Sequence, residues 1–309
     1  MMSSLLPVLP LLLLFLLGFG LQRIRFFSTE SLSHVRRIVS DLALPAVVFQ
    51  AFASIELESR YLFLVGVVFV ICAVMVVLGK LVAKLLKIDS PYFALMMGGF
   101  EVGMLGYALF VSFYGQAHLG KMALMDLGEV VFVFTVLMAL LIKQRDGSAQ
   151  LSTLLRRITS SPVIWAIAAG LVASFIGPHV PRNAVLDQLG RFVELLASLT
   201  VPLIALTIGY GIRFSRASLG IAIKTIAVRK ILLIGWALVI DQVLIRSLLG
   251  IDAMYSAALL TMFMLPPPFV ISIYMSDKTS GQSDYVANTL SLDTLVSVVS
   301  VMVVYLIQG

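Results

Sequence analysis

The sequence predicts an all-α membrane protein with ten transmembrane helices, arranged as two inverted five-helix repeats. Three observations lead to this fold class: a strongly apolar composition, ten apolar runs, and short words that recur in both halves of the chain. Of the 309 residues, 60% are hydrophobic and 12% are charged, about half the charged fraction of a soluble domain. The mean hydropathy is +1.06. The chain is therefore expected to lie in a lipid bilayer.

Residues that carry enzymatic or metal chemistry are scarce. Cys72 is the single cysteine and lies in an apolar run, so no intrachain disulfide can form, and the three histidines form no ligand pair. The motifs of membrane-embedded metalloproteases, aspartyl proteases and serine hydrolases are absent. We therefore expect no enzymatic activity, no cofactor and no metal. The basic residues sort into particular loops, which gives no indication of a nucleic-acid partner.

Ten apolar runs are long enough to cross the hydrocarbon core as helices. In chain order they are Leu5–Leu21, Val35–Ala53, Tyr61–Val82, Tyr92–Phe113, Met122–Ile142, Pro162–Ile176, Leu189–Ile212, Ala227–Leu248, Ala253–Met275 and Val286–Ile307. The first is interpreted as a retained helix and not as a signal peptide, because Arg23 and Arg25 follow the run instead of preceding it. A polar linker, 143–161, separates a first five-helix repeat, 1–142, from a second, 162–309.

Lysine and arginine are distributed unevenly among the loops. The loops after odd-numbered spans hold 17 of the 22 basic residues, and the loops after even-numbered spans hold the other 5. Arg229 and Lys230 are among the 17, assigned to the loop between the seventh and eighth spans. By the positive-inside rule the odd loops are cytoplasmic and both termini lie outside. The expected location is the plasma (inner) membrane.

Three pairs of words recur in the same order in the two halves. They are separated by 157, 163 and 167 residues, and they are Asp41–Val48 with Ser198–Ala205, Ile88–Tyr92 with Ile251–Tyr255, and Asp126 with Asp293. The first pair sets Pro45 opposite Pro202 in the second helix of each half, where we expect both prolines to act as hinges. Because each half has an odd number of helices, the halves insert with opposite orientation, as in inverted-repeat secondary transporters.

Three consecutive prolines, Pro266–Pro268, interrupt the ninth span. Each removes a backbone donor and clashes with the preceding turn, so a continuous helix cannot pass. The 163-residue offset sets Phe100–Gly106 opposite Phe263–Phe269, which predicts that the fourth helix breaks at Gly103 and Gly106. We expect the two broken helices to cross near the middle of the membrane. Their half-helix N-termini would suit an anionic group there.

Two sets of residues are predicted to carry the function. The substrate-binding set belongs to the breaks: Glu101, Gly103, Gly106, Leu265, Pro266, Pro267 and Pro268. Acidic residues inside membranes are rare because burial of their charge is costly, so they mark functional sites. The candidates for proton coupling are Glu101, Asp126, Asp241 and Asp293. For Asp126 and Glu129, which share one helix face, contact with water at the outer interface is the alternative, and Asp41 can pair with Arg37.

Four of these words resemble those of the auxin efflux carrier family. They are Leu-Ala-Leu-Pro45, Gly103-Met-Leu-Gly106, Leu-Thr-Val-Pro202-Leu and Leu265-Pro-Pro. The family includes bacterial malate and malonate carriers and plant auxin exporters. The resemblance implies a ten-helix fold like that of the bile-acid sodium symporters, with a scaffold domain and a crossed-helix transport domain, and elevator-like carriage of organic anions. Two positions depart from the family: Glu101 stands where an asparagine is usual, and the proline expected near Tyr107 is missing.

The expected function is secondary active transport of a small organic anion, such as a dicarboxylate or an auxin-like acid, by proton-coupled or potential-driven efflux. An ionised Glu101 close to the anion would repel it by several kcal/mol at an effective dielectric of about 20. Glu101 is therefore expected to hold a proton while the anion is bound. The alternative is a receptor or channel that binds a ligand without coupled transport. The expected partners are the substrate and the bilayer, and a homodimer is left open.

The predicted orientation can be tested at Ser148 in the linker. A cysteine introduced there, in a chain whose Cys72 is first replaced, should resist membrane-impermeant thiol reagents in intact cells, because the basic linker is kept in the cytoplasm. The Cys72-replaced chain without a new cysteine gives the background, and permeabilised cells give full labelling. Ready labelling from outside would reverse the orientation.

Overall fold

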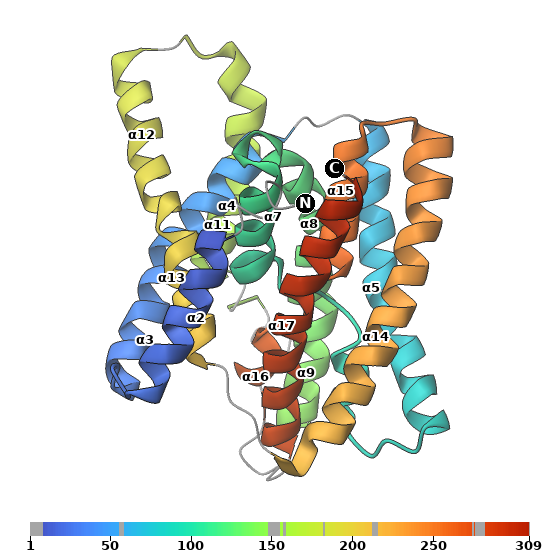
Figure 1. The fold of residues 1–309 in the computed structure, drawn as a ribbon. Coiled ribbons are helices and arrows are strands. Elements are labelled where there is room, and N and C mark those ends of the chain that lie inside the picture. Colours follow the sequence, from blue (N-terminus) through green and yellow to red (C-terminus); the bar gives the residue numbers. More distant parts are fainter. Residues whose placement is uncertain are drawn as a thin grey trace. The chain divides into compact units, whose positions relative to one another are not determined.

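The computed structural model describes residues 9–55, 59–147, 155–156, 159–181, 183–211, 216–273, 275 and 282–308. Every regular element among these residues is a helix (Figure 1). Within the described part of the chain, five helices are long and apolar enough to cross a membrane: Tyr61–Leu85, Gln116–Asp146, Ala184–Gly211, Leu219–Leu249 and Gln282–Ile307. The prediction of an all-helical chain of membrane-protein type is confirmed at this level, and the ten-span inverted repeat stays a prediction. Ser148 and part of the 143–161 linker lie outside the described residues.

The chain divides into two compact units, each of which takes segments from both halves of the sequence. The first unit comprises Met1–Leu57, Gly103–Ala123 and Thr159–Ile212. Its helices are α2 (Leu9–Arg23), α3 (Thr29–Ile38), η2 (Val39–Ala43), α4 (Leu44–Ala53), α7 (Tyr107–Tyr114), η4 (Gln116–His118), α11 (Pro162–Ile176), η6 (Gly177–His179), α12 (Ala184–Ser198) and α13 (Thr200–Gly211). The compact units therefore cut across the predicted repeats.

Glycines allow two pairs of helices in the first unit to approach closely. Helices α2 and α13 lie side by side (Figure 1). A Cβ added to Gly18 would lie 2.2 Å from the backbone oxygen of Leu206. In the α11–α4 pair, a Cβ added to Gly170 would lie 2.8 Å from the backbone oxygen of Phe49. Small residues have this role in membrane helices because they bring the backbones into contact. The two pairs join the first predicted span to the seventh and the sixth to the second.

The proposed hinge prolines occupy similar places in two helices of this unit. Pro45 is the second residue of α4, directly after the π-helical turn η2, and Pro202 is the third residue of α13, after α12 ends at Ser198. Proline is tolerated in a first helical turn because its missing amide has no intrahelical partner there. The Thr200 hydroxyl donates to the Ala43 carbonyl at 2.9 Å, so the two irregular segments are in contact. Hinge motion at these prolines stays a prediction.

The second unit comprises Glu58–Val102, Leu124–Ile158 and Arg213–Gly309. Its helices are α5 (Ser59–Leu85), α6 (Pro91–Leu95), η5 (Val133–Leu137), α9 (Met138–Asp146), η7 (Arg216–Ser218), α14 (Leu219–Val239), η8 (Ile240–Leu249), α15 (Ala253–Phe263), α16 (Val270–Ile273) and α17 (Gln282–Gln308). Two elements cross the boundary between the units, namely η3 (Val102–Gly106) and α8 (Leu119–Phe132). Helices α14 and α17 pack together (Figure 1), and both bring charged side chains into the interior of the unit.

Helix α14 begins earlier than the sequence predicts. The eighth span is expected from Ala227, whereas α14 starts at Leu219. Arg229 and Lys230, which the loop count included although the predicted span begins at Ala227, lie well inside this helix, and both side chains are buried. Their assignment to a cytoplasmic loop is wrong. Lys224 also lies within α14, so the charge count of that loop falls by three. The physical reason is that carbonyl and carboxyl groups of neighbouring segments bind both basic side chains in the interior of the unit.

A pair of alanine substitutions in α2 tests the close helix contact. Gly18→Ala should lower the apparent Tm in detergent, because the new Cβ meets the rigid backbone of α13, and overpacking of this kind typically costs about 1–3 kcal/mol. Gly20→Ala is the matched control, because a Cβ there has no other atom within 4 Å. An unchanged Tm for Gly18→Ala would contradict the packing of α2 on α13.

Candidate functional site

Two helices that begin in the second unit, α6 and α15, are each followed by a non-helical segment before the chain becomes helical again. Helix α6 ends before the segment Met96–Glu101, and the chain resumes a helical path with η3. Helix α15 ends before Met264–Phe269, and α16 follows. We call these two segments the glycine break and the proline break. All residues of the glycine break are buried, and so are all those of the proline break except the half-buried Phe269.

The two breaks lie directly against each other. The Glu101 amide donates to the Pro266 carbonyl at 2.9 Å, and the Phe269 amide donates to Glu101 Oε2 at 2.6 Å. The rings of Phe100 and Phe263 are stacked with their centroids 5.0 Å apart. The breaks thus bind some of the backbone groups that they free, which is the condition for a broken helix in hydrocarbon.

The glycine break lies nearer the N-terminus than the sequence predicts. Gly103 and Gly106 belong to the helical element η3, so the predicted break at these two residues is corrected to Met96–Glu101. The residue there that requires glycine is Gly99, whose φ of 75° is left-handed. A Cβ on Gly99 would also lie 2.8 Å from Pro268 Cγ. Glycine is needed at this position both for the turn and for contact with the proline break.

Arg229 of α14 binds the carbonyl end of α6 at the glycine break. Its guanidinium donates to the carbonyls of Met96, Met97 and Gly99, at 2.8 Å to Met96 and 2.6 Å to Gly99. The side chain is fully buried. The last carbonyls of a helix have no intrahelical partner and carry partial negative charge, so a cation at this end is stabilising.

Lys230, the next residue, binds backbone carbonyls of the proline break in the same way. Its ammonium donates to the carbonyls of Met264 and Leu265 at 2.5 and 3.2 Å, and to Ser297 Oγ at 3.0 Å. Met264 is the C-cap of α15, so Lys230 also binds the carbonyl end of an interrupted helix. Two neighbouring residues of one helix therefore provide hydrogen-bond donors for the free carbonyls of both breaks.

Asp293 of α17 is the counter-ion that these two cations share. Its Oδ1 lies 2.8 Å from Lys230 Nζ, and its Oδ2 lies 3.8 Å from Arg229 Nε. The Asp293 side chain is fully buried. Removing one member of a buried ion pair leaves an uncompensated charge and is strongly destabilising. The geometry gives Asp293 a fixed electrostatic task, which is to neutralise both cations.

Glu129 of α8 contacts the glycine break from another direction. Its Oε1 accepts a hydrogen bond from the Phe100 amide at 2.9 Å. Glu129 and Asp126, one turn earlier, are both buried, which disfavours the interpretation that this pair reaches water. The predicted site omits Glu129, although its three-residue spacing from Asp126 indicated a shared helix face.

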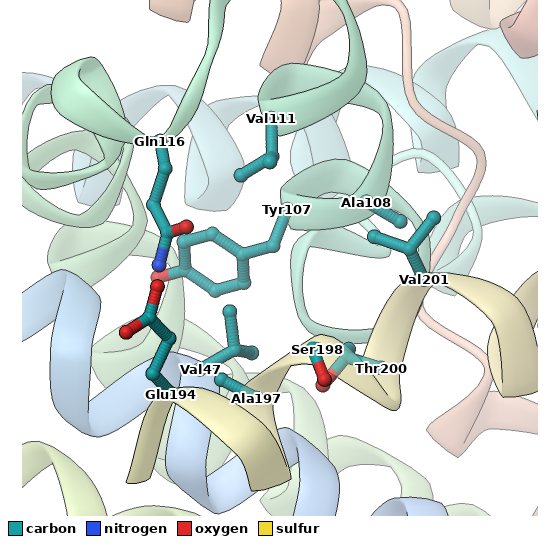
Figure 2. A pocket seen from close by; sticks show the side chains of 10 residues that line it. All are labelled: Val47, Tyr107, Ala108, Val111, Gln116, Glu194, Ala197, Ser198, Thr200 and Val201. Carbon is teal, nitrogen blue, oxygen red and sulfur yellow. The ribbon is translucent and has the colours of Figure 1, made fainter. Parts of the chain in front are cut away.

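The first unit contains a separate cavity of about 130 Å³ (Figure 2). The ends of the Tyr107, Gln116 and Glu194 side chains point toward one another there, and the residues that line the cavity are Val47, Tyr107, Ala108, Val111, Gln116, Glu194, Ala197, Ser198, Thr200 and Val201. Ligand pockets usually measure about 300–1,000 Å³, so this cavity is small for a substrate site. None of these residues belongs to the predicted substrate-binding set, although the sequence places the missing family proline near Tyr107.

Comparison with known proteins identifies the family. Residues 3–305 match the family described as "Membrane transport protein". The chain belongs to this family. An uncharacterized transporter of Methanothermobacter thermautotrophicus is 24% identical over 307 residues, which cover 97% of this chain and 96% of the relative. An uncharacterized transporter of Methanocaldococcus jannaschii is 24% identical over 211 residues, covering 65% and 67% of the two chains.

Membership of the membrane transport protein family confirms the resemblance to auxin efflux carriers and indicates a multi-pass membrane protein. It is a family of transporters and not of enzymes. In this family member the coupling candidates occupy different surroundings. Glu101 lies in the glycine break, Asp126 is buried beside Glu129, and Asp293 is held by two cations. Asp241 forms an ion pair with Arg246 at 2.8 Å within η8, and Asp41 forms the local pair with Arg37 that its spacing indicates, at 3.2 Å.

Two glycines of the fourth span test where the break lies. Gly99→Ala should lower the apparent Tm strongly, because the left-handed φ and the contact with Pro268 both oppose a side chain. Gly103→Ala should be tolerated, because its Cβ would meet only Leu44 methyl groups at 3.6 and 3.7 Å. The measurement is thermal unfolding of the two purified variants. The reverse ranking would move the break back to Gly103.

Proposed function

We propose that this member of the membrane transport protein family is a secondary active transporter of a small organic anion, coupled to protons, in the plasma membrane with both termini outside. The observation that carries the proposal is the pair of buried breaks joined through Glu101. Interrupting two helices sacrifices backbone hydrogen bonds inside the membrane. Transporters of known architecture do so where broken helices form the binding site for substrate and coupling ion.

Two contacts between sequence-equivalent residues support the inverted repeat. Phe100 and Phe263 are stacked and are separated by 163 residues, the offset of the second pair of words. Thr200 binds the Ala43 carbonyl, and these residues are separated by 157, the offset of the first pair. When two similar halves are related by a two-fold axis, equivalent residues meet at that axis. The proposed architecture therefore has the two breaks crossing in the middle of the membrane.

The surroundings of Glu101 support a carboxylate as the group that is carried. A helix that resumes after a break begins with amides that lack intrahelical partners, and these amides favour negative charge. The Phe269 amide already donates to the carboxyl group of Glu101. A carboxyl group is therefore accommodated at this place, and the carboxylate of a substrate would be bound by the same kind of donor.

Charge balance supports the proton as the coupling ion. The described residues buried around the breaks include four carboxyl groups and two basic groups, which are Glu101, Asp126, Glu129, Asp293, Arg229 and Lys230. With all six ionised the net charge would be −2. Two like charges separated by about 4 Å repel by roughly 4 kcal/mol at an effective dielectric of about 20. Protonation of Glu101 would remove one such repulsion and still leave an oxygen to accept from the Phe269 amide.

A Glu101→Gln variant tests the coupling. The amide oxygen of glutamine can accept the Phe269 hydrogen bond, so substrate binding and counterflow should persist, whereas accumulation driven by a pH gradient should be lost. A thermal-shift screen of the purified protein against short-chain carboxylates first identifies a substrate. Uptake of that substrate is then measured in proteoliposomes with an imposed pH gradient. For the unaltered protein, affinity for the anion should rise as the pH falls, because the protonated form of Glu101 favours the anion.

Glu129→Gln is the matched control, because Glu129 also accepts a hydrogen bond from a break amide and lies on a different helix. This variant should retain pH-driven accumulation. If Glu101→Gln concentrates the substrate as the unaltered protein does, Glu101 is not the coupling group. Binding without counterflow in the unaltered protein would instead favour the alternative of a receptor or channel with the transporter fold.

A further inference from the structure

The Lys230 ammonium lies in a cage of oxygen atoms. Besides the Met264 and Leu265 carbonyls and Ser297 Oγ, Asp293 Oδ1 lies 2.8 Å from Nζ. Lys230 is 8% exposed and Asp293 and Ser297 are fully buried. The three N–H groups of the ammonium thus face two carbonyl oxygens, one hydroxyl oxygen and one carboxylate oxygen. All four can accept a hydrogen bond from the positively charged group.

This oxygen set is also the kind that binds a hard metal cation. Such cations take carboxylate, carbonyl and hydroxyl oxygens, and in transporters with broken helices the unwound carbonyls and half-helix C-termini coordinate sodium. Met264 is the C-cap of the interrupted helix α15, so its carbonyl lies at the negative end of that helix. In this protein the Lys230 ammonium occupies the position that a metal cation would take among these oxygens.

The glycine break repeats the arrangement with a different cation. Arg229 binds the carbonyls of Met96, Met97 and Gly99 at the end of α6, and Asp293 lies beside it as well. Both carbonyl ends at the breaks are therefore bound by a covalently attached positive charge. A mobile cation would have to displace one of these side chains from its buried position.

We propose that Lys230 is a specificity-determining residue that takes the place of a coupling metal ion at the proline break. The transport cycle then uses no sodium ion. The inference rests on the proposed function, and it narrows the coupling cation to the proton. Lys230 acts by positioning the proline break through the carbonyls of Met264 and Leu265 and through Asp293.

Sodium dependence of the unaltered protein is the first test. The apparent Tm of the purified protein, measured in sodium chloride and in choline chloride of equal ionic strength, should be the same. Carboxylate uptake in proteoliposomes should likewise be unchanged when choline replaces sodium. A sodium-specific rise in Tm or uptake driven by a sodium gradient would overturn the inference. Because this measurement uses the unaltered protein, it tests sodium dependence even where a Lys230 variant does not fold.

Substitution of Lys230 is the second test. Lys230→Ala empties the cage but leaves its four oxygens, so its Tm should fall in choline chloride and recover by about 2–4 °C in sodium chloride, because a ligand that binds only the folded state stabilises it by mass action. Lys230→Met also removes the charge but fills the space, so its lowered Tm should not respond to sodium. A Lys230→Ala protein that folds and ignores sodium would show that the cage is no cation site.

Arg246→Ala is the control for loss of a cation elsewhere in α14–η8, because Arg246 pairs with Asp241 and, among the described residues, is not seen to bind a helix-end carbonyl. It should show no sodium response. The outcomes also separate this inference from the proposed function. Uptake that responds to pH but requires sodium would leave the proposed function standing and refute the inference. Absence of any anion transport would refute the proposed function and the coupling role with it, and a sodium response confined to Lys230→Ala would then show only that the Lys230 ammonium occupies a cation site.

Discussion

The arrangement of the second unit follows from one constraint, which is that a helix interrupted inside an apolar interior must still bind its freed backbone groups. The glycine break and the proline break meet this constraint partly through each other, by way of Glu101 and Pro266. The remaining groups need side chains from other helices. Arg229 and Lys230 supply donors to the carbonyl ends, and Glu129 accepts from the Phe100 amide. The charged interior is thus a consequence of the two breaks.

Buried charge normally weakens a membrane protein, because its removal from water is compensated only in part. In the second unit this cost is limited because each buried charged group interacts with several partners. Asp293 neutralises two cations, and each of those cations also satisfies helix-end carbonyls. The first unit has no comparable network among its described residues and relies on close backbone contact at Gly18 and Gly170. Close backbone contact also occurs in the second unit, where a Cβ added to Gly128 would lie 2.2 Å from the Val65 oxygen, so the buried charges are what distinguishes its interior.

The sequence predicted the parts of this architecture that depend on local chemistry. Three consecutive prolines in mid-span forbid a continuous helix, so the proline break could be placed to within a few residues. Glycine only permits a break, and four glycines of the fourth span were available, so Gly103 was chosen although the left-handed residue is Gly99. Repeat offsets could not resolve this, because small loop insertions shift them by several residues.

The role of the two basic side chains at the breaks could not be predicted from the sequence for a related reason. Arg229 and Lys230 lie close to a predicted helix end, and basic residues there ordinarily mark the cytoplasmic side. Only the tertiary structure reveals the unpaired carbonyls of two distant segments that they bind. Glu129 was recognised as sharing a face with Asp126, but its hydrogen bond to Phe100 depends on a turn that a single sequence does not specify.

The adjacency of Arg229 and Lys230 also restricts how this chain can evolve. Successive residues on an α-helix point about 100° apart, and here that angle directs one side chain to each break. Insertion or deletion of one residue in α14 ahead of them would rotate both side chains away from their carbonyls at once. Loops elsewhere can change length without this penalty, whereas the register of α14 between Leu219 and Lys230 cannot drift by a single position.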